Sequence, residues 1–431
     1  MLGGGRPATG RDRFSQRPLT HFAFLTPPYA GHLNPMMALA RGLVDRGHAV
    51  TFVAQADVGP EIAAPVGFCP VGARTHPPGR LTRMAARLGG TTGLFGIGAV
   101  IRDMADTTQM LCEDVPDALR RIRAGAIVAD QTEPAGGLVA RHLGVPLVSV
   151  ANALLIDREP ALPPAFVGWG FDDTPWGIRR NLGGYRVADW MMRPVSDVIG
   201  RRAQAWGLGS IDTVEDCLSD RLEISQSVEG FDFPRRAPPP VLHHCGPFRR
   251  PEGRAWQAEA ERPNIFCSLG TLQGARLPIF QAVAAACCSL DLALTIAHGG
   301  KLDAAEVASL PGAPRVEGFV PQCSVLRTVA AAVTHGGLNT VLDALAAGVP
   351  LVVVPLAFEQ GAIAARVARS GSGIVVPRGR FTWRRVAAAL RQVLDEPGFR
   401  ARAEALRDEI AVAGGVARAV ALIERATRPG R

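Results

Sequence analysis

The chain has 431 residues, enough for about two domains, and 47% of them are hydrophobic. Its formal charge is +8, and residues 241–431 carry most of the excess, with 22 basic against 15 acidic residues. The basic residues form no block interleaved with aromatic side chains, so we expect no nucleic-acid partner. A positive second half instead favours a small anionic ligand.

Cysteine spacing and hydropathy indicate the compartment. The eight cysteines form no CxxC pair and no metal-binding pattern, so we expect reduced cysteines, a cytoplasmic protein and no metal. No apolar run reaches the roughly 18 residues that a membrane-spanning helix needs. The first 20 residues lack the apolar core of a signal peptide, and we expect a disordered leader there.

The first half opens with alternating strand and helix patterns. Residues 21–26 are predicted as a strand, the loop 27–35 opens a helix to about residue 46, and residues 49–54 form the next strand. The loop lacks G-x-G-x-x-G, which argues against a dinucleotide-dependent dehydrogenase. It places His32 at the carboxyl end of the first strand.

A second polar residue is expected at the same sheet edge. Asp130 ends the apolar strand 126–129, and a helix (134–143) and a strand (145–150) follow it. A carboxylate at this edge can hold the imidazole of His32 by one ring nitrogen and stabilise its cation, as a general base requires. By position alone, His32 could be a solvated loop residue and Asp130 an acid at a helix start.

The remaining chain predicts a second unit of the same kind. Residues 179–206 have helical tendencies, and residues 234–263 contain seven prolines, which favours a linker. A strand at 264–267 is followed by Ser268 and Thr271, whose hydroxyls can donate to a phosphate. Further strands are predicted at 292–297, 315–319, 331–334, 351–355 and 374–377, and helices at 383–394, 398–412 and 414–427.

The most informative stretch is residues 315–360. An apolar run is followed by His-Gly-Gly at 335–337 and then by a helical pattern. Such a turn places free backbone N–H groups and the positive end of a helix dipole at a strand end, where doubly wound sheets bind phosphates. Asn339 and Thr340 add donors, and Asp343 offers an acceptor for ribose hydroxyls. An ordinary turn with a capping Asn and a core His would show the same spacing.

This stretch resembles the nucleotide-sugar box of the UDP-dependent glycosyltransferases related to plant secondary-product enzymes. The resemblance implies that Phe319 stacks on uracil beside Gln322, that Asp343 binds the ribose, and that Glu359 and Gln360 bind the sugar. Glu359 stands where the family usually has Asp, and Gly336 and Leu338 stand where the plant enzymes have Cys and Trp. The predicted UDP-binding residues are Ser268, Thr271, Phe319, Gln322, His335, Gly336, Gly337, Asn339, Thr340 and Asp343.

The resemblance covers nearly the whole chain from His21 onward. The segments GFDFPRR, SLGTLQG, THGGLNTVLDAL and PLAFEQ resemble bacterial zeaxanthin glucosyltransferases. The implied fold is α/β GT-B, with two Rossmann-like doubly wound domains facing across a cleft. The expected parts are a leader (1–20), an acceptor-binding domain (21–235), a linker (236–263), a UDP-sugar domain (264–410) and a helix that crosses back (411–431).

The implied activity is an inverting transfer of glucose from UDP-glucose to a lipophilic alcohol, zeaxanthin or a related hydroxylated carotenoid, giving a β-glucoside. The loop Gly31-His32-x-Asn34-Pro35 matches the family's catalytic-base loop, so His32 is the expected base and Asp130 its acid partner. The chain has no Asp-x-Asp, so we expect no donor-site metal and no cofactor besides the co-substrate UDP-glucose.

Three alternatives stay open. A macrolide, flavonoid or sterol glycosyltransferase would share this chemistry and differ only in the acceptor region, residues 60–230. A UDP-sugar epimerase of the same fold would bind the donor but need acid and base groups beside the sugar. An inactive partner subunit would keep the nucleotide box but lack the pair formed by His32 and Asp130.

Two arginine-rich stretches suggest how the protein could reach a water-insoluble acceptor in a membrane. Arg80–Arg102 and Arg179–Trp206 interleave arginine with Leu, Met, Phe or Trp. Such segments suit an anionic bilayer surface, although two ordinary amphipathic helices would show the same pattern. We therefore predict peripheral contact with the inner face of the cell membrane around the acceptor entrance.

Overall fold

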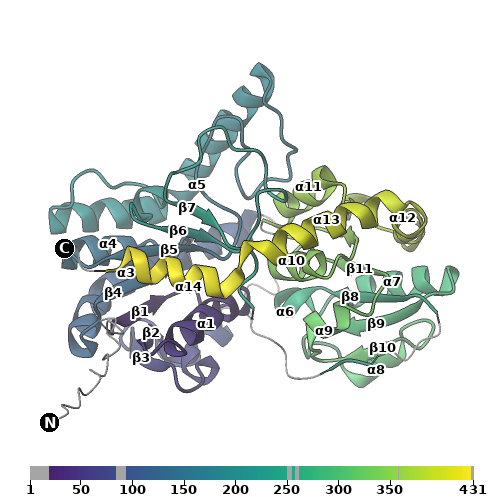
Figure 1. Cartoon of the computed structure of the whole chain (residues 1–431), viewed down its shortest axis with the longest axis horizontal. Helices are drawn as coiled ribbons and strands as arrows, with labels where there is room; N and C mark the ends of the chain where they lie inside the picture. The colour runs from purple at the N-terminus through teal and green to yellow at the C-terminus, as the bar shows by residue number, and fades with distance from the viewer. Residues whose placement is uncertain (1–18, 84–93, 250–254, 258–261, 358, 429–431) are drawn as a thin grey trace, which may run out of the picture.

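The computed structural model describes residues 19–83, 94–249, 255–257, 262–357 and 359–428, and nearly all of the predicted leader lies outside these ranges. It shows two parallel sheets, each with helices on both faces (Figure 1). The predicted α/β class with two Rossmann-like doubly wound units is therefore confirmed.

The first sheet contains, within the described ranges, seven parallel strands in the order β3-β2-β1-β4-β5-β6-β7. They are β1 (His21–Leu25), β2 (Ala49–Gln55), β3 (Gly67–Val71), β4 (Ala126–Asp130), β5 (Leu147–Ala151), β6 (Glu223–Ser225) and β7 (Leu242–His244). The helices around this sheet are α1 (Ala30–Val44), α3 (Leu94–Ile122), α4 (Ala135–Leu143), α5 (Pro175–Trp206) and, from the far end of the chain, α14 (Gly415–Ala426).

The second sheet contains, in the same described part, six parallel strands in the order β10-β9-β8-β11-β12-β13. They are β8 (Asn264–Ser268), β9 (Ala293–Ala297), β10 (Arg315–Glu317), β11 (Ala331–Thr334), β12 (Leu351–Val353) and β13 (Gly373–Val375). The helices of this half are α6 (Gly270–Gln273), α7 (Leu277–Ser289), α8 (Ala304–Ala308), α9 (Gln322–Leu326), α10 (Leu338–Ala346), α11 (Gln360–Ser370), α12 (Trp383–Asp395) and α13 (Pro397–Ala413).

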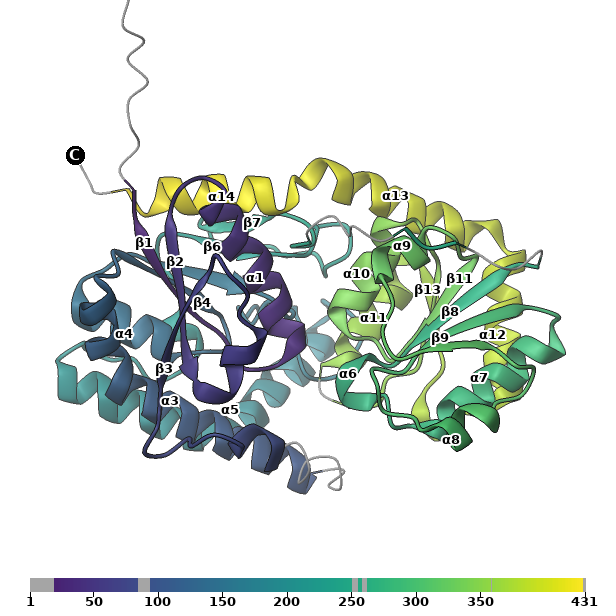
Figure 2. The ribbon, with the colours of Figure 1, turned by 90° about the horizontal axis from the view of Figure 1, so that it is seen from below.

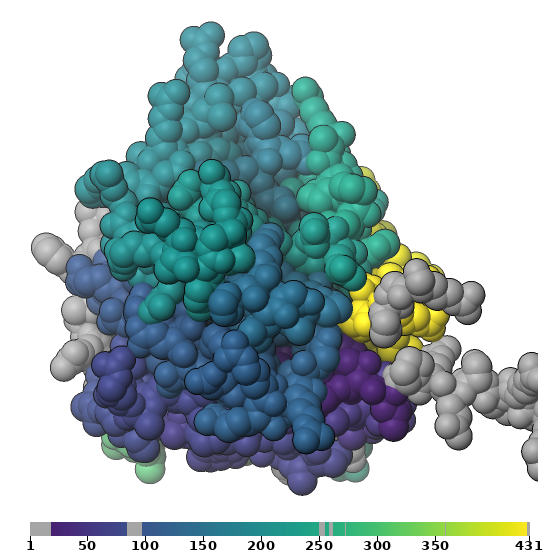
Figure 3. Space-filling model, turned by 90° about the vertical axis from the view of Figure 1, so that its left-hand side faces the viewer, coloured from purple at the N-terminus to yellow at the C-terminus, as the bar shows by residue number. Residues whose placement is uncertain are grey.

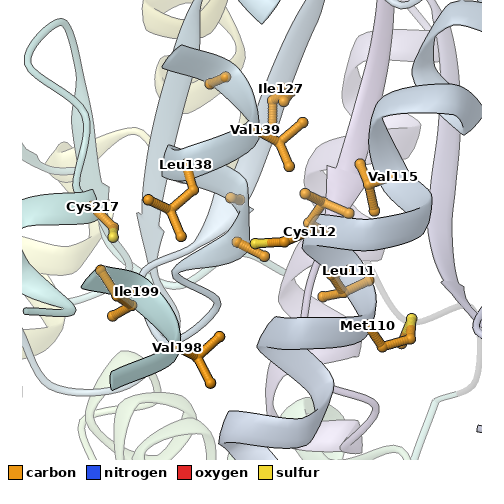
Figure 4. Packing of buried hydrophobic residues seen from close by; sticks show 14 of the residues in the cluster. Met110, Leu111, Cys112, Val115, Ile127, Leu138, Val139, Val198, Ile199 and Cys217 are labelled. Atoms are coloured by element: carbon orange, nitrogen blue, oxygen red, sulfur yellow. The ribbon is translucent and has the colours of Figure 1, made fainter. Parts of the chain in front are cut away.

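Successive strand residues fill two separate layers of each domain, because side chains of a strand alternate between faces. Phe22 and Phe24 of β1 pack with α1 and α14 on one face of the first sheet. Ala23 and Leu25 pack on the other face with α3, α4 and α5, a layer that Figure 4 shows around Cys112. Both faces of the parallel sheet are thus buried, as continuous apolar strands require.

The two sheets place their switch points at equivalent positions. The strand order reverses between β1 and β4 in the first sheet, and between β8 and β11 in the second. At a switch point, the loops after two adjacent strands run to opposite faces of the sheet. The crevice between these loops is where doubly wound folds bind ligands. Asp130 and Ser268 are the last residues of β4 and β8, His32 lies in the first turn of α1 after β1, and His335 directly follows β11, so predicted site residues lie at both switch points.

Apolar and ionic contacts join the two halves. Leu154, Val228 and Phe231 from the first half belong to the core formed by β8, β12 and α10 of the second. Helices α13 and α14 run from the second half back over the first, as Figure 2 shows. There Glu424 of α14 accepts hydrogen bonds from Arg46 at 2.5 and 2.7 Å.

The segment 236–263, predicted as a linker, also contributes to the fold. Its residues 242–244 form β7, the edge strand of the first sheet. A three-residue strand among prolines carries no detectable alternation, so hydrophobic periodicity does not reveal it. Among the described residues, no helix combines the length and the apolar character needed to cross a membrane.

Candidate active site

The first half of the site is a histidine–carboxylate pair. His32 lies in the first turn of α1 and Asp130 ends β4, which pairs with β1. His32 Nδ1 and Asp130 Oδ2 are 2.7 Å apart. The His32 side chain is 22% exposed and the Asp130 side chain is fully buried. Nδ1 of His32 therefore donates to the carboxylate, which leaves Nε2 free to accept a proton.

Other groups fix the orientation of Asp130. Its Oδ1 accepts hydrogen bonds from the backbone N–H and the hydroxyl of Thr132, at 2.9 and 2.6 Å. Its Oδ2 also accepts from the side-chain amide of Asn152, at 2.7 Å. Four donors on one buried carboxylate stabilise its charged form and hold it rigidly under the imidazole.

The charges around the pair set its protonation. Burial by itself would lower the pKa of His32, but the Asp130 carboxylate outweighs it and raises the pKa above its ordinary value, with Glu359 acting in the same direction. Burial would raise the pKa of Asp130, yet His32 and Thr132 hold it below its usual range. Asp130 is thus ionised and stabilises the imidazolium that forms when His32 takes a proton.

A neutral carboxyl lies behind this pair. Burial, followed by the charge of Asp130, raises the pKa of Glu133 to about 8. Burial also raises the pKa of the Tyr29 hydroxyl to about 12. Glu133 is therefore mostly protonated at neutral pH, and the Tyr29 hydroxyl keeps its proton well beyond it.

The second half of the site is the glycine turn after β11. His335 is buried at this turn, and burial lowers its pKa to about 4, so the imidazole is neutral. Two glycines make room for its ring. A Cβ atom at Gly337 would lie 2.7 Å from the ring of His335, and one at Gly270, where φ is +69°, would lie 2.9 Å from it. Neither glycine position accepts a side chain while His335 keeps its place.

Helix α10 begins directly after this turn, at Leu338, with Gly337 as its N-cap residue. Its first N–H groups have no partners within the helix and point toward the switch point. Ser268 at the end of β8 is buried, and its hydroxyl accepts from the N–H of Gly270. Thr271 is exposed in α6. Predicted diphosphate-binding residues from both strands thus meet at this turn.

The predicted ribose acid is held by two side chains. Asp343 is buried, and its Oδ1 accepts from Arg249 Nε at 2.8 Å. Its Oδ2 accepts from Gln322 Nε2 at 2.7 Å. A cavity of about 340 Å³ borders Asp343 and Arg249. Gln322 and Asp343 are thus hydrogen-bonded to each other, and Arg249 is an additional partner of Asp343 from the predicted linker.

Asn339 contacts the first domain. Its amide Nδ2 donates to the backbone carbonyl of Gly31, next to His32, at 2.8 Å. Its Oδ1 accepts from Gln226 Nε2 and Arg249 Nη2, each at 2.9 Å. Gln226 in turn donates to the backbone carbonyl of Asn152 at 2.6 Å. A continuous chain of hydrogen bonds therefore links the partner of Asp130 to the donor half of the site.

The remaining predicted residues differ in their surroundings. Phe319 is 71% exposed, so its ring face is open to a planar ligand. Glu359 precedes α11 and acts on the charge of His32 across the domain boundary. Gln360 is buried, and its side-chain oxygen accepts from the N–H groups of Leu356 and Ala357. That oxygen shapes the loop, which leaves the amide nitrogen as the group with sugar-binding capacity.

Comparison with known proteins identifies the family. Residues 282–421 match the model described as "Erythromycin biosynthesis protein CIII-like, C-terminal domain". The chain is 36% identical to a zeaxanthin glucosyltransferase of Pantoea ananas, over 96% of this chain and 97% of that one. It is 38% identical to a zeaxanthin glucosyltransferase of Pseudescherichia vulneris, over 95% and 98%. This chain belongs to the family of glycosyltransferases that contains these enzymes.

A solved structure supports the GT-B fold of this glycosyltransferase. The glycotransferase of kitacinnamycin superposes with a TM-score of 0.75 at 22% identity, over 95% of this chain and 99% of that one. The predicted GT-B fold is therefore confirmed. Within it, the two switch points supply one half of the site each.

Four contributors to this site were missed by sequence reasoning. They are Thr132, Asn152, Gln226 and Arg249. Asn152 and Gln226 directly follow β5 and β6, so the rule that pointed to Asp130 could have found them. Arg249 follows no regular element, and no local signal marks it. Among the described residues, no group of three or more His, Cys, Asp or Glu side chains is arranged to hold a metal ion.

Proposed function

We propose that this glycosyltransferase transfers glucose from UDP-glucose to a hydroxyl of a lipophilic alcohol, zeaxanthin or a related hydroxylated carotenoid. The observation that carries the proposal is the 2.7 Å contact between His32 and Asp130 beside a glycine turn that suits a diphosphate. Both relatives above are zeaxanthin glucosyltransferases, and the similarity to them extends over the acceptor half of this chain.

In the proposed reaction, the acceptor oxygen attacks the anomeric carbon of glucose while the bond from that carbon to the diphosphate oxygen breaks. Nε2 of His32 takes the proton of the attacking hydroxyl, a role worth about 10²–10⁴-fold in rate. Asp130 balances the charge of the imidazolium. Attack opposite to the leaving UDP inverts the anomeric centre and gives a β-glucoside.

The leaving UDP gains negative charge, and the turn after β11 is suited to stabilise it. The free N–H groups at the start of α10 provide oriented dipoles, and they act without reorganising during the reaction. Because His335 is neutral, it contributes a hydrogen-bond donor and not a positive charge.

Across the domain boundary, the glucose is expected to lie between His32 and the start of α11. Glu359 can accept hydrogen bonds from sugar hydroxyls, and the amide nitrogen of Gln360 can donate one. The effect of the Glu359 charge on His32 supports this placement, since it requires the two groups to be near each other.

A donor and acceptor panel tests the proposal. Purified protein is given UDP-glucose, UDP-galactose or dTDP-glucose with zeaxanthin, a flavonol, a sterol or a macrolide aglycone, and products are identified by mass spectrometry and NMR. We expect β-glucosides of zeaxanthin from UDP-glucose. Products from the flavonol, sterol or macrolide alone would overturn the carotenoid assignment, an α-anomer would overturn inversion, and preference for dTDP-glucose would overturn the donor.

A further inference from the structure

Helix α5 displays a row of arginines that the chemistry of the site does not use. Arg179, Arg186 and Arg193 are spaced by seven residues, which places them along one side of a 32-residue helix. All three are exposed, and none forms an ion pair within the part of the chain that the structure describes. The row is therefore available to an external anion or anionic surface.

Large apolar side chains lie beside this row. Trp176 is 66% exposed, Trp190 is 72% exposed and Val187 is 54% exposed. At 100° per residue, all three fall within about 80° of the arginine row on the helical wheel. The guanidinium of Arg180 lies 5.3 Å from the ring centroid of Trp176 and braces it at the surface. Exposing two tryptophans to water is unfavourable unless something covers them.

Acidic groups of α5 offset the charge of this face only in part. Asp189 is held by Arg158 at 2.7 Å, and Asp197, one turn beyond Arg193, lies at the end of the arginine row. The same helix carries six arginines. Asp172 and Asp173 precede the helix, where Asp172 accepts from Thr174 at the N-cap and Asp173 pairs with Arg236. The exposed face of α5 is thus basic and aromatic together.

The face lies at the edge of the site. The N-terminal end of α5 and the loop before it form the peak of the molecule (Figures 1 and 3). That loop starts near Asn152, whose side chain binds Asp130, and it reaches the second domain at Gly168. A Cβ atom on Gly168 would lie 3.3 Å from the backbone of Gly361, which directly follows the predicted sugar-binding pair. The loop therefore connects the active site to α5.

We propose that this face of α5 docks the enzyme on an anionic lipid bilayer. Arginines attract anionic headgroups, while tryptophans enter the interface between headgroups and acyl chains. Docking there brings the acceptor side of the cleft to the membrane surface, where a lipophilic alcohol is dissolved. The docking proposal is argued from the residues of α5 alone. The role of docking in acceptor delivery rests on the proposed function.

The second predicted membrane stretch, Arg80–Arg102, contributes less to this surface. Arg80 pairs with Asp103 at 2.6 Å and is not free, because the first acid of α3 on that side neutralises it. Residues 84–93 lie outside the described residues, as do the side chains of Leu94 and Phe95. The proposal therefore uses α5 and not this stretch.

Co-sedimentation of the full chain with vesicles tests docking. We expect strong binding to phosphatidylcholine vesicles containing phosphatidylglycerol, weak binding to pure phosphatidylcholine, and loss of most binding at high salt. The variant Arg179→Gln/Arg186→Gln/Arg193→Gln should bind anionic vesicles about a hundredfold more weakly. The variant Trp176→Ala/Trp190→Ala should lose the binding that survives high salt.

A control variant with the same change in net charge tests whether the position of the arginines on α5 matters. The variant Arg378→Gln/Arg385→Gln/Arg391→Gln removes three exposed arginines around α12, in the other domain, and should bind like the wild type. Equal loss in both triple variants would overturn the proposal in favour of general electrostatic attraction. The wild type could instead fail to bind vesicles and form a dimer in ultracentrifugation that the α5 variants do not form. That result would overturn membrane docking and assign this face to contact between two copies of the chain.

Rates of zeaxanthin glucosylation in micelles and in vesicles test membrane docking and the proposed acceptor separately. The α5 variants should glucosylate zeaxanthin in detergent micelles like the wild type, and at least about tenfold more slowly in anionic vesicles. Vesicle binding without zeaxanthin transfer in either medium would contradict the proposed acceptor and leave docking supported. Equal rates of variants and wild type in both media would overturn the role of docking in acceptor delivery.

Discussion

Asn339 of the donor half donates a hydrogen bond to the backbone carbonyl of Gly31, the residue before the candidate base, at 2.8 Å. The sequence predicts Asn339 as a diphosphate ligand, but its amide also binds the loop of the other domain. The same side chain accepts from Gln226, which contacts Asn152. Asn339 is thus placed to align the domains as well as to meet the donor.

We expect Asn339→Ala to lower kcat by about five- to tenfold, because one interdomain hydrogen bond contributes about 1 kcal/mol. Gln226→Ala should lower kcat similarly, and the double variant should be less impaired than the product of both effects, since both belong to one network. Steady-state kinetics and UDP calorimetry test this. A loss of UDP affinity with kcat unchanged would assign Asn339 to the diphosphate alone.

Asp130→Asn should shift the pH profile. The base acts when His32 is neutral, so kcat/KM rises as pH increases through the pKa of His32. Asp130 raises this pKa, and its replacement removes the charge, so the inflection should move to lower pH while the rate falls. A profile of kcat/KM against pH measures both effects. An inflection that stays in place would show that a group other than His32 controls it.

Gly337→Ala should weaken the donor site. The added Cβ would lie 2.7 Å from the ring of His335, while the backbone angle of Gly337, φ −66°, suits alanine. The expected result is a raised KM for UDP-glucose and a lowered kcat. Gly398→Ala is the matched control, because a Cβ there meets nothing within 4 Å. Equal kinetics of both variants would mean that His335 moves freely and does not contribute to binding.

The buried pair of Arg366 and Asp232 should contribute to the stability of the domain interface. Arg366 Nε lies 2.6 Å from Asp232 Oδ1, and the side chains are 3% and 7% exposed. Arg366→Met leaves the buried Asp232 carboxylate with only Arg235, 3.7 Å away, so we expect a loss of up to about 3 kcal/mol in the free energy of unfolding. The exposed pair of Arg120 and Asp117 gives the control, Arg120→Met, at less than about 1 kcal/mol. Denaturant titration compares them.

The same pair gives a pH dependence of stability. Burial would raise the pKa of Asp232, but Arg366 and Arg235 outweigh it and hold the pKa below its ordinary value. The stabilisation is therefore present above the unfolded pKa of about 3.9 and is lost as pH falls through the lower folded value. Arg366→Met should flatten this acid limb. Identical slopes for the variant and the wild type would exclude Asp232 as its source.

The fold class and the two ends of the site followed from sequence because both depend on local patterns. Apolar runs mark buried parallel strands, and His32, Asp130 and His335 stand where such runs end. Arg249 and Gln226 could not be found in this way. Their partners lie 94 and 113 residues away along the chain, at Asp343 and Asn339, and only the packing of the two domains brings them together.

The exact surroundings of predicted residues were also beyond the sequence. His335 is neutral because it is buried, and Glu133 is protonated because it is buried beside Asp130. Burial of this kind arises from tertiary contacts, and a motif records only residue types. The sequence therefore predicted the candidate residues, while the protonation of these groups followed only from the structure.

Kinetics and UDP binding of His32→Ala test the central claim most directly. His32 belongs to the acceptor domain, and the proposed UDP site belongs to the other, so the two functions should separate. We expect His32→Ala to lower transfer by at least about a hundredfold, with the UDP dissociation constant measured by calorimetry unchanged. Transfer above about a tenth of the wild-type rate, with UDP bound normally, would contradict His32 as the catalytic base.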